Sequence, residues 1–294
     1  MTRSVIVTCC NHGATSSIAL VSAAKAAALE LFKHDCNAQL AKGRRAPAIT
    51  TVGRFVDRRA PRLTRKIIKV FNAHRKKIAA KVSAAYKKKL QKASEEDLID
   101  RILRDLELEG LSAEIIEEVK PDLIEAFKRS GVTAVTEVNV VATHDIVNLL
   151  DKGAVNYMKE HGAELIEELA GTTEKGIRRL LVEAVEKGKS PQDLATEIEE
   201  LSSFGAERAS TIARTELAFA HMQGNVEGWR GSGVVIGKEW LLGDLHDIDD
   251  ECDDAAEAGI VPFEDEFSAG LDFPPAHPNC ICAIRPITGG EEEQ

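Results

Sequence analysis

Residues 54–92, RFVDRRAPRLTRKIIKVFNAHRKKIAAKVSAAYKKKLQK, decide the fold class. Their apolar positions recur at spacings near three or four, or twice that, so they share one face of a helix, and lysines and arginines cover the other faces. The shared face comprises Ile67, Phe71, Ile78, Val82, Tyr86 and Leu90. This pattern predicts a long basic amphipathic helix. Aromatic residues make up only 4% of the chain, so Ala, Leu, Ile and Val must fill most of the core, which favours helices.

Helical signals continue beyond this segment. Ser94, followed by three acidic residues, is typical of a helix start, because a side-chain oxygen and negative charge suit the free amide groups there. Ser190-Pro191 predicts another start. The stretch 132–141 (VTAVTEVNVV) is rich in β-branched residues among helix signals and is left unassigned. The other predicted helices span residues 112–119, 121–129, 143–169, 174–187 and 206–229, and a short strand is predicted around Trp240.

The composition divides the chain into five parts. Residues 1–53 are an Ala-rich segment that ends in a linker at 43–53, and 54–92 form the basic helix. Residues 93–230 form a helical body that ends in the IARTE helix. Residues 231–288 form a small, loop-rich α+β C-terminal domain, and 289–294 a disordered acidic tail. The predicted fold class is mainly α, with a small C-terminal Cys/His domain.

Charge is distributed unequally between the two ends of the chain. Residues 1–92 carry 21 Lys+Arg against 3 Asp+Glu, whereas the remainder carries 17 against 45. Such asymmetry indicates that one end binds a polyanion, and nucleic acid fits because each neutralised phosphate releases counterions. Docking on an acidic protein surface and simple solvation are the alternatives. The candidate DNA contacts are Arg65, Lys66, Lys69, Arg75, Lys76, Lys77, Lys81, Lys87, Lys88 and Lys89.

Several functional classes find no support in the sequence. The HExxH, GxSxG and GxGxxG motifs are absent, so a common hydrolase or dehydrogenase is not indicated, and the chain is predicted not to be an enzyme. No run of about 18 apolar residues occurs, and the N-terminus is a poor secretory signal. We therefore expect a protein made and kept in a cytoplasm, with no membrane partner.

A Cys/His constellation lies near the C-terminus. Residues 274–282, PPAHPNCIC, together with Cys252 provide three thiols and one imidazole, which matches the ligand count of a closed zinc site. The candidate ligands of one zinc ion are therefore Cys252, His277, Cys280 and Cys282. Free, partly buried thiols and a disulfide formed after release from the cell are the alternatives.

Two further motifs carry charge. The sequence Ile212-Ala213-Arg214-Thr215-Glu216 places Arg214 and Glu216 two residues apart, so they do not face each other on a helix. We expect both in structural ion pairs, with partners in the acidic C-terminal part. Residues 244–254, DLHDIDDECDD, hold seven carboxylates and His246, which is typical either of a solvated loop or of a cation site.

The order of these signals resembles the phage head morphogenesis family, the minor head proteins typified by the F protein of phage Mu. The similarity covers about residues 153–287. The matching pieces are Ile212–Glu216, Gly224, Trp240, Asp244, Cys252, Gly259 and residues 274–282. Met222, Ala255 and Ile281 stand where the family often has Asn, Cys and Arg, and the absent cysteine excludes a four-thiol site.

The resemblance implies a virion component of low copy number inside the head near the portal, present in the host cytoplasm during assembly. It would assist head assembly and genome packaging or delivery. Its partners would be the portal protein, viral double-stranded DNA and a major capsid or scaffolding protein. Two alternatives are a metal-dependent hydrolase acting on nucleic acid and a zinc-stabilised DNA-binding regulator. The hydrolase would use Asp244, Asp247, Asp249 or Asp250 around a cation, with His246 as base.

Overall fold

The computed structural model describes residues 48–89, 95–104, 106, 109–160, 164–243, 250–268 and 270–288. These residues form a mostly helical molecule with one small antiparallel sheet near the C-terminus. The predicted fold class is therefore confirmed. The helices are α2 (Ala48–Lys89), α3 (Glu95–Arg104), α4 (Glu109–Glu137), α5 (His144–Glu160), α6 (Glu164–Lys187), α7 (Pro191–Glu199), α8 (Ala206–Ser232) and α9 (Glu251–Glu257), and the strands are β1 (Val235–Leu241), β2 (Ile260–Pro262) and β3 (Ala283–Thr288).

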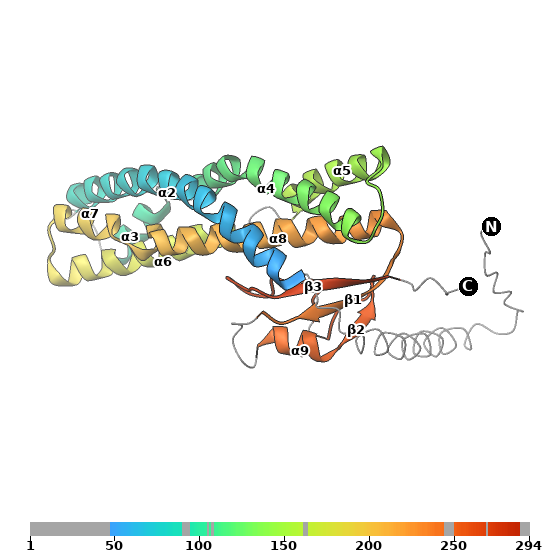
Figure 1. Cartoon of the computed structure of the whole chain (residues 1–294). Helices are drawn as coiled ribbons and strands as arrows, with labels where there is room; N and C mark the ends of the chain where they lie inside the picture. The colour runs from blue at the N-terminus through green and yellow to red at the C-terminus, as the bar shows by residue number, and fades with distance from the viewer. Residues whose placement is uncertain are drawn as a thin grey trace, which may run out of the picture.

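Helix α8 lies at the centre of the described structure. It packs against α2, α4 and α5, and Figure 1 shows it running lengthwise between these helices and the sheet. Its own sequence explains this position, because apolar or small residues occur on nearly every side of the helix and fifteen of its residues are buried. A helix that is buried all round must be enclosed by neighbours on several sides. Helix α8 therefore connects the helical part to the sheet.

Helix α2 buries the apolar face that its periodicity predicts. Ile67, Phe71 and Tyr86 are each fully buried, and Ile78 and Val82 are at most 3% exposed, whereas Leu90 lies outside the described residues. The prediction of a linker over 43–53 is wrong from Ala48 onward, because α2 begins there. Val52 and Val56 continue the buried face, so their burial favours the earlier start of the helix.

Two other predicted boundaries differ from the structure. The unassigned stretch 132–141 belongs to α4 as far as Glu137, because Ala134 and Val135 are fully buried and tertiary packing outweighs the propensity of β-branched residues. After the helix, Asn139 has a left-handed φ of 60°, and the Val140 amide donates to the Val135 carbonyl. The helix predicted over 143–169 is divided into α5 and α6.

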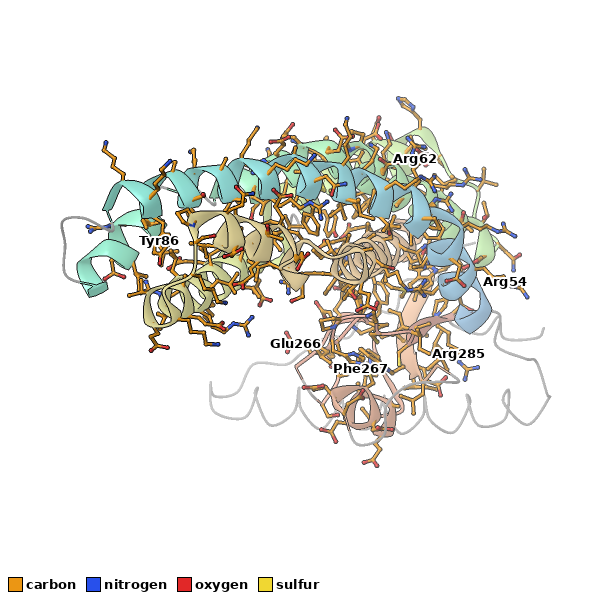
Figure 2. The ribbon with its side chains drawn as sticks, turned by 90° about the vertical axis from the view of Figure 1, so that its left-hand side faces the viewer. Arg54, Arg62, Tyr86, Glu266, Phe267 and Arg285 are labelled. Carbon is orange, nitrogen blue, oxygen red and sulfur yellow. The ribbon has the colours of Figure 1, made fainter. Side chains whose placement is uncertain are left out.

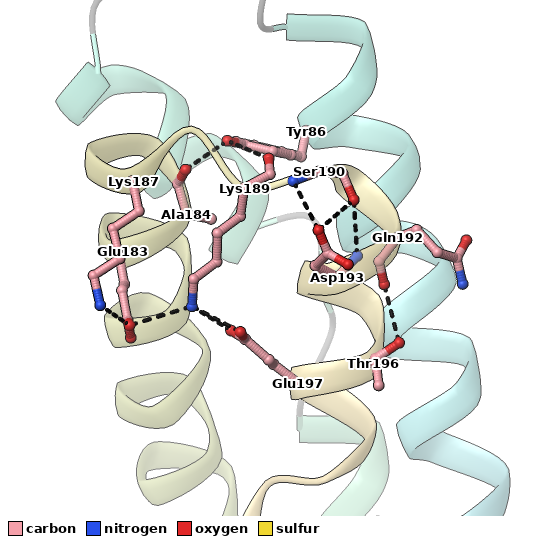
Figure 3. A network of polar contacts seen from close by, with 10 residues as sticks. All are labelled: Tyr86, Glu183, Ala184, Lys187, Lys189, Ser190, Gln192, Asp193, Thr196 and Glu197. Carbon is pink, nitrogen blue, oxygen red and sulfur yellow. Dashed lines mark hydrogen bonds and ion pairs between the residues drawn. The ribbon is translucent and has the colours of Figure 1, made fainter.

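The turn between α6 and α7 confirms the predicted helix start. Ser190 and Asp193 form a reciprocal capping box at the first turn of α7, as Figure 3 shows. The Tyr86 hydroxyl of α2 donates to the Ala184 carbonyl of α6 at 3.0 Å, and Lys189 pairs with Glu197 at 2.7 Å. The Tyr86 contact holds the far end of α2 on the α6–α7 hairpin, and the Lys189–Glu197 pair stabilises the hairpin itself.

The sheet packs beside α8 with strand order β2-β1-β3, and all pairs are antiparallel. The predicted strand around Trp240 is confirmed as β1. Trp240 is buried and meets Phe267 edge to face, with 5.3 Å between ring centroids. Lys238 on the same strand is 2% exposed, and its Nζ donates to the Asp272 carbonyl at 2.9 Å, so the loop before β3 is fixed to the sheet.

Glycines allow the backbones of α4 and α8 to touch. A Cβ atom on Gly224 would lie 2.2 Å from the Phe127 carbonyl oxygen, and one on Gly228 would lie 2.3 Å from the Gly131 carbonyl oxygen. Both obstacles are backbone atoms, which cannot turn aside as a flexible side chain can. The contact between these two helices therefore requires residues without a side chain at these positions.

We expect Gly224→Ala to destabilise the protein by about 2 kcal/mol, because overpacking against the α4 backbone outweighs the roughly 1 kcal/mol by which alanine favours a helix. Thermal or urea unfolding followed by circular dichroism would measure the change. The matched control is Gly171→Ala in α6, where nothing lies within 4 Å of the position that the new Cβ atom would occupy, and no loss is expected. Equal stability of Gly224→Ala and the wild type would contradict the requirement for close helix contact.

Candidate metal centre and nucleic-acid surface

The candidate metal ligands come from two segments that the sheet brings together. Cys252 lies in the first turn of α9, and His277, Cys280 and Cys282 lie in the loop that leads into β3. Helix α9 begins there because Asp250 caps it: its Oδ1 accepts from the Cys252 amide at 2.8 Å. The capping carboxylate therefore fixes the backbone that carries the first ligand.

Three of the four candidate ligands have the spacing of a metal site. The ligand atoms of Cys252, His277 and Cys280 all lie within 4.8 Å of one another, so the group can hold a metal ion. The sulfur atoms of Cys252 and Cys280 are 3.6 Å apart. Tetrahedral coordination with Zn–S bonds of about 2.3 Å places two sulfurs about 3.8 Å apart, so this pair needs almost no adjustment.

Cys282 lies outside that group of three but borders it. The Cys282 side chain is buried, and its thiol interacts with the thiols of both Cys252 and Cys280. A small movement would therefore bring the Cys282 thiol into position as a fourth ligand.

His277 is oriented as a ligand would be. Its Nδ1 lies 3.1 Å from the Pro278 carbonyl oxygen, so an Nδ1–H would donate to that oxygen and leave Nε2 with its lone pair. Nε2 is buried and makes no directional hydrogen bond, although Asp250 Oδ2 lies 3.2 Å away. In that tautomer, Nε2 offers its lone pair to a cation held between it and the two thiols.

Proton sharing among the thiols also favours a cation. Hydrogen bonds from Cys252 and Cys282 lower the pKa of Cys280, whereas the hydrogen bond to Cys280 raises the pKa of Cys252, because a second thiolate would face the first in a buried space. Without a cation, the cluster therefore favours a single thiolate. A metal ion would remove this repulsion and allow all the thiols to ionise.

The IARTE motif fixes the Cys/His loop and helix α2 to α8. The Thr215 hydroxyl accepts from the Asn279 amide at 2.9 Å, which connects α8 to the residue before Cys280. Arg214 pairs at 2.8 Å with Asp57 of α2. The expected partner in the C-terminal part is therefore wrong for Arg214: the packing of α2 along α8 brings an α2 carboxylate closer.

Glu216, the other member of the expected ion pair, is 2% exposed. Burial is the main cause that raises the pKa of Tyr157, and the negative charge of Glu216 adds to it. Glu216 therefore faces α5 within the helical part.

The candidate DNA contacts divide into outward and inward groups. Lys66 pairs with Asp122 of α4 at 2.7 Å, and Arg75 donates to the Glu199 carbonyl at 3.4 Å, so these two are directed toward neighbouring helices, and their contact with DNA stays a prediction. Both lie on the flanks of α2, within reach of α4 and the end of α7. The side chain of Lys89 lies outside the described residues. The exposed group is Arg65, Lys69, Lys76, Lys77, Lys81, Lys87 and Lys88.

Sequence reasoning missed part of the basic surface. Arg54, Arg58 and Arg62 are also exposed, at intervals of four residues, and continue the outward row toward the start of α2. Their spacing was a usable signal, because residues four apart share a helix face. Figure 2 shows Arg54 and Arg62 on the outer side of the helix bundle.

The acidic segment 244–254 is described only from Asp250 onward. Asp250 and Asp253 form the capping box of α9, so the helix start accounts for both carboxylates. The hydrolase alternative places Asp244, His246, Asp247 and Asp249 around a cation, and these residues lie outside the described part.

The fold and the site define a helical protein with a small sheet that carries a Cys/His cluster. Residues 175–285 match the model of the family described as "Phage Mu protein F like protein". This match confirms the resemblance to the phage head morphogenesis family for that part of the chain, from α6 to β3.

A curated relative matches in addition. The "Uncharacterized protein YqbB" of Bacillus subtilis (strain 168) is 28% identical over 126 residues, which are 42% of this chain. The matched segment spans 41% of the length of that relative. No solved structure matches. None of the helices in the described ranges combines the length and the hydropathy of a membrane span.

We expect Thr215→Val to destabilise the protein by about 1 kcal/mol, because the Asn279 amide loses its acceptor while the side-chain volume is kept. The measurement is the midpoint of thermal or urea unfolding. Thr215→Ser retains the hydroxyl and serves as the matched control. A valine variant as stable as the serine variant would show that this hydrogen bond does not hold the Cys/His loop.

Proposed function

We propose that this chain is a minor head protein of a tailed phage or prophage that assists head assembly and genome packaging or delivery at the portal. It would lie inside the head near the portal, with the portal protein, viral double-stranded DNA and a capsid or scaffolding protein as partners. The proposal assigns it no catalytic step. The family match over residues 175–285 supports the role in the head.

The outward basic row of α2 carries the DNA part of the proposal. Arg54, Arg58, Arg62, Arg65, Lys69 and Lys76 follow one another at intervals of three, four or seven residues, so they share one face. With 1.5 Å per residue, exposed basic residues from Arg54 to Lys88 extend over about 51 Å. Double-stranded DNA carries one charge per about 1.7 Å of axis, so this length can neutralise several phosphates.

The Cys/His group supports the proposal of a structural zinc ion. Thiolates are soft ligands, which favour zinc over magnesium or calcium, and three thiols with one imidazole form a closed tetrahedral set. The ion would join α9 to the loop before β3. Its role in the proposal is to stabilise the fold of the C-terminal part, and it takes no part in a reaction.

Co-sedimentation tests the proposed role. The full chain would be centrifuged with purified portal protein and, separately, with duplex DNA over a series of salt concentrations. The proposal expects binding to both at low salt, and DNA binding that weakens steeply as salt rises. Absence of binding to either partner at low salt, or DNA binding insensitive to salt, would overturn it.

A charge variant locates the DNA surface. We expect replacement of Arg65, Lys69, Lys76 and Lys77 by Gln to weaken duplex binding at least about tenfold at about 0.1 M salt and to reduce the salt slope, because fewer phosphates are neutralised. Fluorescence anisotropy with a labelled duplex would measure both. The matched control replaces four exposed basic residues of α5 and α6, Lys152, Lys159, Lys175 and Arg179. Equal losses in both variants would indicate an effect of net charge alone.

We expect about one zinc ion per purified chain by elemental analysis, and its loss in Cys280→Ser and Cys252→Ser. Because ion binding contributes to folding, a chelator should lower the unfolding temperature. His277→Gln should weaken zinc retention, whereas His144→Gln at an exposed position of α5 should not. Freshly reduced wild-type protein without metal would contradict the zinc site.

A further inference from the structure

A cavity of 340 Å³ opens where the first half of α2 lies against α4 and α8. Three arginines of α2 line it, with two carboxylates of α4 and one leucine each from α2 and α8. The lining residues are Arg58, Arg59, Arg62, Leu63, Asp122, Glu125 and Leu217. The DNA contacts predicted from the sequence and the Cys/His group include none of these residues, whereas Arg58 and Arg62 belong to the outward basic row.

The positive charges around this cavity exceed the negative ones. Asp122 already forms ion pairs with Arg62 at 3.1 Å and with Lys66 at 2.7 Å. Glu125 then faces the remaining guanidinium groups of Arg58 and Arg59. Such unbalanced charge beside a cavity favours an anion.

The guanidinium groups also repel one another. Burial is the main cause that lowers the pKa of Arg59, and the positive charge of Arg129 on α4 and that of Arg58 lower it further, whereas the negative charge of Glu125 opposes them. A bound anion would offset this repulsion.

The position of Arg59 is fixed before any ligand binds. Its guanidinium lies 3.9 Å from the centre of the Phe55 ring, and Phe55 stacks on the His221 ring with centroids 4.3 Å apart. His221 Nδ1 lies 2.5 Å from the Ser130 hydroxyl oxygen of α4. Burial lowers the pKa of His221 to about 4, so the ring at the base of this stack is neutral at pH 7. A guanidinium held in this way loses little entropy when it forms a two-point contact.

We propose that this cavity binds a phosphate group, with Arg58 and Arg59 as its principal contacts. Arginine matches phosphate because its planar fork donates two parallel hydrogen bonds. The phosphate would come from the backbone of nucleic acid, a source that rests on the proposed function, because Arg58 and Arg62 also belong to the outward basic row. A duplex laid along α2 would bring its backbone over the cavity.

The test compares two pairs of substitutions on the same helix. Arg58→Gln with Arg59→Gln removes two charges from the cavity, and Arg65→Gln with Lys69→Gln removes two charges outside it. Each protein is titrated with inorganic phosphate and pyrophosphate by calorimetry, and with a short labelled duplex by anisotropy over a salt series. Circular dichroism verifies folding, and Arg58→Gln alone replaces the cavity pair if Arg59→Gln prevents folding.

The expected result is a loss of at least about tenfold in affinity for both small anions in the cavity pair and an unchanged affinity in the outer pair. The salt slope for the duplex should fall by about one for each lost phosphate contact in both pairs. Small-anion affinities that the cavity pair leaves at the wild-type value, or that the outer pair lowers equally, would overturn the cavity assignment.

The outcomes separate this inference from the proposed function. Duplex binding that is lost in the outer pair and kept in the cavity pair leaves the DNA surface standing and refutes the cavity site for nucleic acid. Small-anion binding that depends on the cavity pair, in a protein that binds no duplex, refutes the DNA surface and assigns the cavity to free phosphate.

Discussion

The direct contact between the backbones of α4 and α8 determines the arrangement of the other elements. Gly224 and Gly228 meet the carbonyls of Phe127 and Gly131, so the two helices approach more closely than side chains would permit. This contact fixes both the distance between the helices and the rotation of α8 about its axis. Once α8 cannot rotate, each of its other faces has a defined neighbour. One face receives α2, another receives α5, and its C-terminal end leads into β1.

The positions of the basic face of α2 and of the Cys/His group both depend on α8. Arg214 pairs with Asp57 of α2, and Thr215, one residue further, accepts from the amide of Asn279. Adjacent residues on a helix point about 100° apart, so one short motif joins the basic helix on one side and the Cys/His loop on another. Arg214 and Thr215 of this motif therefore connect both elements to α8.

The sequence predicted the elements that rest on local rules. The 3.6-residue period located α2 and the buried residues from Ile67 to Tyr86, and Ser190-Pro191 located the start of α7. The types of the candidate ligands and their order along the chain predicted the Cys/His group. In the fold, a small three-stranded sheet holds α9 beside the loop before β3, so these residues meet. What failed depended on tertiary packing. Burial of Val52 favours a helix in part of the predicted linker, and burial of Val135 keeps a β-branched stretch in α4.

The sequence also could not predict which group each basic side chain would contact, for a physical reason. Each cation on a helix can reach any acidic group within several ångströms, and the sequence does not show which neighbour will be close. Lys66 and Arg75 thus turned to α4 and α7, and Arg214 to α2. Sequence reasoning missed the arginine cavity for the same reason. Its carboxylates come from α4, and the His221 ring that stacks on Phe55 comes from α8.

The charge asymmetry of the chain can now be divided between two causes. Docking on the chain's own acidic part explains the flanks of α2, where Lys66 meets Asp122 and His74 meets Glu114. It explains less of the row from Arg54 to Lys76: Arg62 pairs with Asp122 of α4, but the basic side chains of the row remain exposed. Folding alone would gain little from concentrating like charges on one exposed face, because they repel one another. An external polyanion would compensate that repulsion, and this supports a nucleic-acid partner for the outer face of α2 over solvation alone.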